Sequence, residues 1–419
     1  MPMPKLLLVN PPIYDFTAYD FWMKPLGLLN VGGILKESGA FKLYFFDFLE
    51  EKIRRDSYGR GKFPEQRIEK PKEFESILRY YKRFGLPAKN FQDFLQSIDE
   101  LDYVLIGSTM TYWYKGIEEV IRHIRTFHPE AKIAIGGIYA TLCPEHAKSL
   151  GADYVIENDA QLESLLKVKI NNFAFPLWQA YKKLDYGVIR LTKGCPFRCS
   201  YCASFALYKN FRSLPIGKVL RELRYFVSRG IKNIAFYDDA LLYKPEEILI
   251  PFLREVQKHF GNFFNFHTPN ALNARFFNEE IAKEMLKAGF KTFFFGFESA
   301  IGEWRKKTGN KVTNQELVKA VKTLIKLGVD KQRITAYVMM GHPEQKPEEV
   351  EESIKFVKNL GIKVMLSEYS PVPKTRDFEK AMKKANLPKD EPLYQNKTAY
   401  PIFLWGQKTI NRLKLLAKL

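Results

Sequence analysis

Three cysteines stand within eight positions of a chain of 419 residues that has only four cysteines in all. Cys195, Cys199 and Cys202 follow the spacing C-x3-C-x2-C, and thiolates at such spacing can converge on one metal centre. A structural zinc ion almost always has four protein ligands, and no fourth Cys or His stands nearby. A four-iron cluster held by three thiolates keeps one iron open to an exogenous ligand, which is what chemistry at the metal requires.

With Tyr201 directly before the third cysteine, the loop Gly194–Cys202 resembles that of the radical S-adenosylmethionine (SAM) superfamily. The resemblance implies a [4Fe-4S] cluster on Cys195, Cys199 and Cys202, with SAM chelated by the open iron and Tyr201 at the cofactor loop's aromatic position. In that family the reduced cluster cleaves SAM to a 5′-deoxyadenosyl radical, which abstracts hydrogen from an unreactive carbon. A structural zinc knuckle or chance clustering is the alternative.

The cysteine loop follows the first of six strand-like runs that are separated by amphipathic helical patterns. This succession predicts a partial (β/α)6 barrel of the TIM type, in which chemistry sits at the carboxyl ends of the strands. The runs are Gly187–Leu191, Asn233–Tyr237, Phe263–His267, Thr292–Phe297, Ile334–Met340 and Lys363–Tyr369.

The ends of the later strands supply further candidates for SAM binding. Asp238 and Asp239 follow the second strand, where the superfamily has an acidic motif for the SAM amino group, and adjacent carboxylates can hold an ammonium. Asn270 lies beyond the third strand, and Glu298 after the fourth is placed to reach a ribose hydroxyl. For each residue, a helix cap or a buried polar partner is the alternative.

Two residues are candidates for catalysis because of their position in the predicted barrel. His267 ends the third strand, where its imidazole would face the mouth or pack in the interior. Tyr337 lies inside the fifth strand, where it could face the lumen and handle a proton or a hydrogen atom.

Residues 1–170 alternate strands with helices, which predicts a doubly wound, Rossmann-like parallel sheet. The expected strands are Lys5–Val9, Lys42–Phe48, Tyr103–Ile106, Lys132–Ile135 and Tyr154–Ile156. Ligands of such sheets bind outside the carboxyl ends of the strands. The residues there are Pro11, Pro12, Ser108, Thr109, Met110, Thr111, Tyr112, Trp113, Gly136, Gly137 and Tyr139.

This region resembles the cobalamin (B12)-binding domains that precede many radical SAM domains. The resemblance rests on Pro11-Pro12, Pro25–Leu29, Gly136-Gly137 and Ala152–Val155, in this order. It implies that the strand-end residues bind cobalamin. Because no histidine occurs before His123, the loop after the first strand supplies no ligand to the lower face of the cofactor. A sheet domain that binds no cofactor is the alternative.

Three further segments complete the organisation: a basic insertion at 51–90, a linker at 171–186 between the domains, and a C-terminal extension at 376–419 after the barrel at 187–375. The insertion could be a lid, a contact for an anionic substrate, a surface arm or a solvated excursion. Residues 393–403 read as irregular. Residues 407–419 read as a basic amphipathic helix that covers the barrel edge, packs on the first domain or lies on a membrane surface.

The formal net charge of +19 fits either a polyanionic partner such as nucleic acid or a solvated basic surface. Four cysteines give no disulfide framework, no run approaches a membrane span, and we expect a cytoplasmic protein. The two resemblances together imply a cobalamin-dependent radical SAM enzyme that methylates an unactivated carbon, with ferredoxin or flavodoxin as electron donor. The alternatives are a radical SAM enzyme without cobalamin, such as an RNA-modifying one, and a non-catalytic iron–sulfur electron-transfer or sensing protein. A methylthiotransferase is disfavoured, because only Cys143 remains for a second cysteine set.

Overall fold

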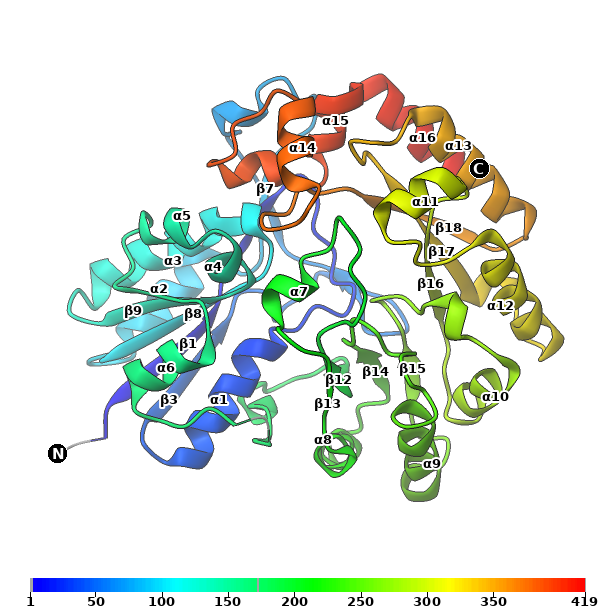
Figure 1. The fold of residues 1–419 in the computed structure, drawn as a ribbon. Helices are drawn as coiled ribbons and strands as arrows, with labels where there is room; N and C mark the ends of the chain where they lie inside the picture. The colour runs from blue at the N-terminus through cyan, green and yellow to red at the C-terminus, as the bar shows by residue number, and fades with distance from the viewer. Residues whose placement is uncertain (1–2, 172, 419) are drawn as a thin grey trace. The chain divides into compact units, whose positions relative to one another are not determined.

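The computed structural model describes residues 3–171 and 173–418. The chain divides into two compact units (Figure 1). The first comprises Met1–Leu184 with Asp390–Gln395, and the second comprises Asp185–Lys389 with Asn396–Leu419.

The first unit is built on a five-stranded sheet whose strands all run parallel. Its strands are β1 (Lys5–Asn10), β3 (Lys42–Asp47), β8 (Tyr103–Ser108), β9 (Lys132–Gly137) and β10 (Tyr154–Ile156). The expected strands are confirmed. Their order in space is β10-β9-β8-β1-β3, so the direction of winding reverses between β1 and β8. Loops that leave these two neighbouring strands go to opposite faces of the sheet, and ligands of doubly wound sheets bind at this reversal.

Amphipathic helices connect and cover the strands of this sheet. They are α1 (Leu26–Ser38), α2 (Ala88–Gln96), α3 (Tyr114–Phe127), α4 (Ile138–Leu142), α5 (Pro144–Lys148) and α6 (Asp159–Leu166). In α3, Ile117, Val120 and Ile124 follow the helical period and are almost completely buried. The helix begins close to the loop after β1, because a Cβ atom on Gly116 would lie only 1.9 Å from the carbonyl oxygen of Pro12.

The basic insertion folds onto the first unit. β2 (Ile13–Asp15), β6 (Glu65–Ile68) and β7 (Tyr81–Phe84) form an antiparallel sheet in the order β2-β7-β6. β4 (Arg54–Arg55) and β5 (Gly61–Lys62) form a hairpin, and η1 (Lys72–Phe74) lies between β6 and β7. The rings of Phe16, Phe74 and Tyr81 pack with centroids 4.9–5.4 Å apart, all three side chains being buried. A solvated excursion is therefore the wrong description of this segment.

The segment expected to link the domains packs within the first unit. Trp178, in η3 (Trp178–Ala180), is fully buried, and the Leu177 amide donates to the Leu29 carbonyl at 2.9 Å. A Cβ atom on Gly33 would lie 2.0 Å from the Phe175 carbonyl oxygen, so α1 needs a glycine where this segment crosses it.

The second unit contains six parallel strands in sequence order. They are β11 (Gly187–Ile189), β14 (Asn233–Phe236), β15 (Asn265–His267), β16 (Phe293–Glu298), β17 (Ile334–Met340) and β18 (Lys363–Glu368). The hydrogen bonding divides them into the sheets β11-β14-β15 and β16-β17-β18. Parallel bridges from Phe266 to Phe290 and from Leu272 to Phe295 join the two sheets. This is the predicted partial barrel.

Helices lie on the outer side of these strands (Figure 1). They are α8 (Ile216–Ser228), α9 (Leu249–Phe260), α10 (Glu279–Lys287), α12 (Asn314–Lys326) and α13 (Pro347–Asn359). A capping box starts α12: Thr313 accepts from the Glu316 amide, and Glu316 accepts from the Thr313 amide.

The C-terminal extension is helical: α14 (Phe378–Lys384), η6 (Pro392–Gln395), α15 (Ala399–Trp405) and α16 (Gln407–Lys418). Helix α16 packs on α13 and on the edge strand β18, with Ile410 and Leu413 fully buried. It therefore covers the open edge of the barrel, one of the arrangements that the sequence suggests.

The prediction of an irregular segment over 393–403 is wrong for α15. The Asn396 side chain accepts from the Thr398 and Ala399 amides, in the turn that leads into this helix. Pro401 lies in the first turn, where a missing N–H breaks no helical hydrogen bond. Within residues 3–171 and 173–418, helices are too short or too polar to span a bilayer.

Candidate functional site

The cysteine loop begins where β11 ends. The short strands β12 (Thr192–Lys193) and β13 (Arg212–Ser213) pair antiparallel and close the base of the loop. Gly194 has φ of +79°, and a Cβ atom there would lie 2.9 Å from the Asn210 carbonyl oxygen. The chain can therefore turn into the loop only with glycine at this position.

The three cysteines of the loop are free thiols in a largely buried setting. Cys199 is buried and the other two are partly buried. Burial raises the pKa of each thiol, for Cys195 to about 11. The amide of Ser204 donates to the Cys202 sulfur at 3.5 Å. Three thiols without disulfide partners in one loop fit a metal centre, and metal binding would have to displace their protons.

The described residues contain no group of three Cys, His, Asp or Glu side chains that converge on a single ion. A structural zinc ion almost always has four protein ligands, whereas the loop has three thiols. A cubane cluster held by three thiolates keeps one iron open to another ligand. The number of cysteines in the loop therefore fits a cluster.

Main-chain contacts hold the loop from two sides. The Ser200 amide donates to the Thr308 carbonyl at 3.1 Å, at the end of α11 (Gly302–Thr308). On the other side, Arg376 donates to the Arg198 carbonyl at 2.7 Å and the Asp377 amide to the Ser200 carbonyl at 3.3 Å. Two segments remote in sequence thus fix the path of the loop.

Tyr201 belongs to the loop and is partly buried. Its ring stacks on the ring of Trp304, with centroids 6.2 Å apart and an interplanar angle of 12°. Burial, together with nearby Glu298 and Cys199, raises the pKa of Tyr201 well above its usual value. Tyr201 therefore lies close to a thiol of the loop, and its predicted contact with a cofactor stays a prediction.

The two acids after β14 have different surroundings. Asp238 is buried, and its carboxylate accepts from the amides of Leu191 and Thr192 at 3.0 and 2.6 Å and from the Thr192 hydroxyl at 2.7 Å. Burial raises its pKa to about 6. Asp238 thus fixes the backbone that enters the cysteine loop, which corrects its expected place on the SAM amino group. Asp239 is exposed and accepts from the Ser204 hydroxyl at 3.0 Å, so it is available to a ligand.

A second charged pair lies beside the cysteines. Glu298 has φ of +70° and its carboxylate is 3.1 Å from the Lys311 ammonium. Burial would lower the pKa of Lys311, but the attraction of Glu298 and of the Cys199 thiol outweighs burial and holds the pKa above its usual value. A positive φ strains the backbone of a residue other than glycine, and such strained residues are concentrated at functional sites. Lys311 was not among the expected residues, since nothing in its sequence context separates it from the other lysines.

The remaining candidates of the barrel have defined partners. His267 is fully buried, with Nδ1 3.2 Å from the Thr292 hydroxyl and Nε2 3.3 Å from the Asn233 side-chain oxygen. Its imidazole therefore packs in the interior, which is the second of the two arrangements that the sequence leaves open, and its catalytic role stays a prediction. The Tyr337 hydroxyl donates to the Pro269 carbonyl at 3.0 Å, so its proton is engaged in a hydrogen bond. Asn270 is exposed.

In the first unit, the loops after β1 and β8 line one small pocket. The lining residues are Asn10, Pro11, Pro12, Ile13, Leu49, Gly107, Ser108, Thr109, Met110, Trp113 and Ile117. The pocket therefore lies at the reversal of the sheet. Thr109 and Met110 are exposed, and the indole of Trp113 donates to Asp15 at 2.8 Å.

The loop after β9 joins the same edge through Ser108. The Ser108 hydroxyl donates to the Gly136 carbonyl at 2.7 Å and accepts from the Tyr139 amide at 3.2 Å. Gly137 has φ of +99°, and a Cβ atom there would lie 2.4 Å from the Ser108 carbonyl oxygen. Of the expected residues, Thr111, Tyr112 and Tyr139 are buried and support the loops from inside.

Comparison with known proteins gives the second unit a family. Residues 189–357 match the family model of the radical SAM superfamily. A curated relative, the uncharacterized methyltransferase PH0819 of Pyrococcus horikoshii, is 33% identical over 202 residues, which are 48% of this chain and 42% of the relative. The chain spans about half the length of the curated relatives it matches, such as a second uncharacterized methyltransferase, sll1242 of Synechocystis, of which it covers 50%.

Solved structures resemble the whole chain in fold. The radical SAM methyltransferase TsrM of Kitasatospora setae, solved with cobalamin and a [4Fe-4S] cluster bound, has a TM-score of 0.69 at 15% identity, over 99% of this chain and 91% of that one. The cobalamin-dependent radical SAM enzyme OxsB, solved with aqua-cobalamin and SAM, has a TM-score of 0.56 at 13% identity, over 98% and 56% of the two chains. The fold of this protein is therefore that of cobalamin-binding radical SAM enzymes.

Proposed function

Because its second unit is a radical SAM domain, we propose that this protein is a radical SAM enzyme that uses cobalamin to methylate an unactivated carbon. The observation that carries the proposal is the loop of three free cysteines at the end of the first barrel strand, within the residues that match the family model. Methylation is the activity named for the relative PH0819 and for TsrM, and it is the reaction class that we infer for this chain.

In this proposal Cys195, Cys199 and Cys202 hold a [4Fe-4S] cluster. When bound, the reduced cluster supplies the electron that cleaves SAM. The protein contributes the position of the thiols: Asp238 anchors the entry to the loop, and Thr308 with Asp377 anchors its middle. The partial burial of the thiols excludes water from the site.

The charges beside the loop fit the amino-acid end of SAM, which carries an ammonium and a carboxylate. We infer that the exposed carboxylate of Asp239 holds the ammonium and that Lys311 pairs with the carboxylate, since charge-assisted hydrogen bonds are the strong ones. Glu298, freed by that exchange of partners, is then available to a ribose hydroxyl. Asn270, exposed beyond β15, is a further polar contact.

We infer that the first unit binds cobalamin at the edge formed by the loops after β1, β8 and β9. The support is the reversal of winding at β1 and β8, and the exposed small and apolar side chains at this edge, such as Thr109, Met110 and Ile138. Pro11, Pro12 and Trp113 complete the lining. The loop after β1 contains no histidine, so it donates no lower ligand to cobalt.

Anaerobic reconstitution with iron, sulfide and cobalamin tests the proposal. We expect iron, the absorbance of bound cobalamin, and release of 5′-deoxyadenosine from SAM after reduction with dithionite. Cluster uptake without 5′-deoxyadenosine would identify an electron-transfer or sensing protein instead. SAM cleavage by a protein that binds no cobalamin would leave a radical SAM enzyme whose first unit serves another purpose, and would contradict the methylation proposed here.

A further inference from the structure

A network of contacts runs from Tyr201 through Trp304, His342 and Asp377 back to Ser200, and we call it the circuit. It begins and ends in the cysteine loop. At one end the ring of Tyr201 stacks on Trp304, and at the other the Ser200 carbonyl accepts from the Asp377 amide. His342, which directly follows Gly341 at the end of β17, joins Trp304 to Asp377 and is fully buried.

The hydrogen bonds of His342 define its tautomer. Its Nδ1 atom lies 3.1 Å from the Trp304 indole nitrogen and 3.2 Å from the Glu344 amide nitrogen, and both of these groups only donate. Nδ1 therefore carries the lone pair. The hydrogen is on Nε2, which donates to the Asp377 carboxylate at 2.9 Å. Both ring nitrogens of His342 are thus hydrogen-bonded, and these bonds fix the orientation of its imidazole.

Helix α11 closes the circuit on its other side. The Thr308 hydroxyl donates to the Trp304 carbonyl at 2.9 Å, and the Thr308 carbonyl accepts from the Ser200 amide at 3.1 Å. Both main-chain groups of Ser200, the residue after Cys199, are therefore held by the circuit. Tyr201 is the next residue, and its ring stacks on that of Trp304.

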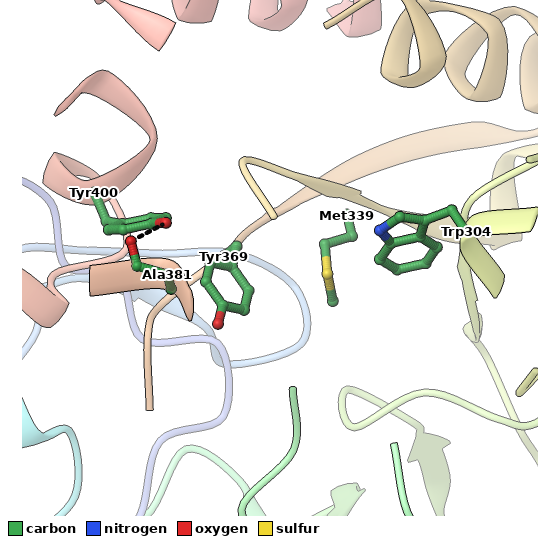
Figure 2. Close-up of a cluster of buried hydrophobic side chains, with 5 residues drawn as sticks. All are labelled: Trp304, Met339, Tyr369, Ala381 and Tyr400. Carbon is green, nitrogen blue, oxygen red and sulfur yellow. Dashed lines mark hydrogen bonds between the residues drawn. The ribbon is translucent and has the colours of Figure 1, made fainter. Parts of the chain in front are cut away.

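A buried cluster of Trp304, Met339, Tyr369, Ala381 and Tyr400 supports these contacts, and Figure 2 shows its members. The Tyr369 ring meets the His342 ring edge to face at 5.0 Å. The Tyr400 hydroxyl donates to the Ala381 carbonyl at 3.0 Å (Figure 2), which ties α15 to α14. Asp377 directly precedes α14, so the packing of that helix sets the position of its carboxylate.

We propose that His342 is a positioning residue for the cysteine loop: by joining Trp304 to Asp377 it holds Tyr201 and Cys199 where the thiolates accept a cluster. The inference rests on the proposed function, because it concerns the same loop. Regular strand pairing holds the loop only at its base, between β12 and β13, so the loop needs support from outside itself. Groups that orient metal ligands without binding the metal commonly change metal affinity or activity by 10–100-fold when they are removed.

His342→Ala tests this inference, with two matched variants. We expect it to lower the affinity of the protein for the reconstituted cluster by about 10–100-fold and to change the electron paramagnetic resonance spectrum of the reduced cluster. His342→Gln, whose amide both accepts and donates, should recover part of the affinity. His128→Ala removes another buried histidine, whose Nε2 lies 3.1 Å from the Leu95 carbonyl in the first unit, and should load iron like the wild type.

Trp304→Phe keeps an aromatic ring against Tyr201 but removes the indole N–H and part of the ring volume, so it tests the circuit even if His342→Ala fails to fold. We expect a smaller loss of cluster affinity in the same direction. A folded His342→Ala protein with wild-type iron content and an unchanged spectrum would overturn the inference. Equal losses in His342→Ala and His128→Ala would also overturn it, since the effect would then be general instability. A wild-type protein that takes up no cluster would instead overturn the proposed function.

Discussion

At the scale of single residues, Asp238 shows that adjacent like residues can have opposite roles. Successive side chains of an extended segment point to opposite faces, so only one of Asp238 and Asp239 can face inward. The sequence indicates that an acid stands at this strand end, but not which of the two is buried. The structure gives the inward place to Asp238 and leaves Asp239 exposed.

Burial of Asp238 makes stability depend on pH. Its pKa is about 6 in the folded protein, against an ordinary value of 3.8. Between these values the folded state keeps a proton that the unfolded state has lost, so the free energy of unfolding falls as pH rises, by up to about 3 kcal/mol. Urea unfolding at pH 4 and pH 7 should show this fall in the wild type and in Asp239→Asn, but not in Asp238→Asn. Identical pH dependence in all three proteins would contradict the assignment.

Lys311 is the residue-scale feature that the sequence does not disclose. It is one of 66 lysines and arginines, and only the fold brings it to Glu298 and the cysteines. Its neighbours in sequence form the turn between α11 and α12, which carries no motif. Chemistry that depends on such a long-range approach cannot be identified from local patterns.

Replacing Lys311 with Met should weaken SAM binding. A hydrogen bond between charged groups contributes about 1.5–3 kcal/mol, so we expect the dissociation constant to rise about tenfold or more. Anaerobic calorimetry on the cluster-loaded protein measures it, with Lys307→Met, an exposed change in the last turn of α11, as control. Equal SAM affinity in both variants would remove Lys311 from the binding site.

At the scale of elements, the hydrophobic periodicity of the sequence predicts most strands and helices. It fails where hydrogen bonds near a helix end, and not the apolar pattern, mark the helix. The alternation and the apolar runs of the parallel strands identify all the strands of both parallel arrays. Helix α15 is missed, because Pro401 and a run of aromatic residues obscure its pattern, and the Asn396 contacts in the turn before it are not visible in the sequence. The insertion is likewise missed as a packed unit, since the cluster of Phe16, Phe74 and Tyr81 joins residues far apart in sequence.

Helix α16 provides a test at this scale. Leu413 is fully buried against the rest of the barrel unit, whereas Leu415 on the same helix is 57% exposed. Leu413→Ala should lower the free energy of unfolding by about 2–5 kcal/mol, and Leu415→Ala should change it by less than about 0.5 kcal/mol. Denaturant titration of the two variants measures the difference. Similar small losses in both would mean that α16 does not cover the barrel edge.

At the scale of the whole molecule, the sequence predicts both folds because each repeats a strand–helix unit with a clear period. What it leaves open is how distant segments support the site. Arg376 and Arg198 are 178 positions apart, yet their hydrogen bond helps to hold the cysteine loop. The loop itself is visible in the sequence, whereas its support comes from α11 and from the start of the C-terminal extension, which no local pattern connects to it.

The release of 5′-deoxyadenosine tests the central claim most directly. Anaerobically reconstituted wild-type protein and its Cys199→Ala and Cys143→Ala variants are reduced with dithionite in the presence of SAM, and the nucleoside is quantified per chain. Cys143 is the one cysteine outside the loop. The account predicts 5′-deoxyadenosine from the wild type and from Cys143→Ala, and none from Cys199→Ala. Absence of the nucleoside from a cluster-loaded wild type, or its undiminished release by Cys199→Ala, would contradict it.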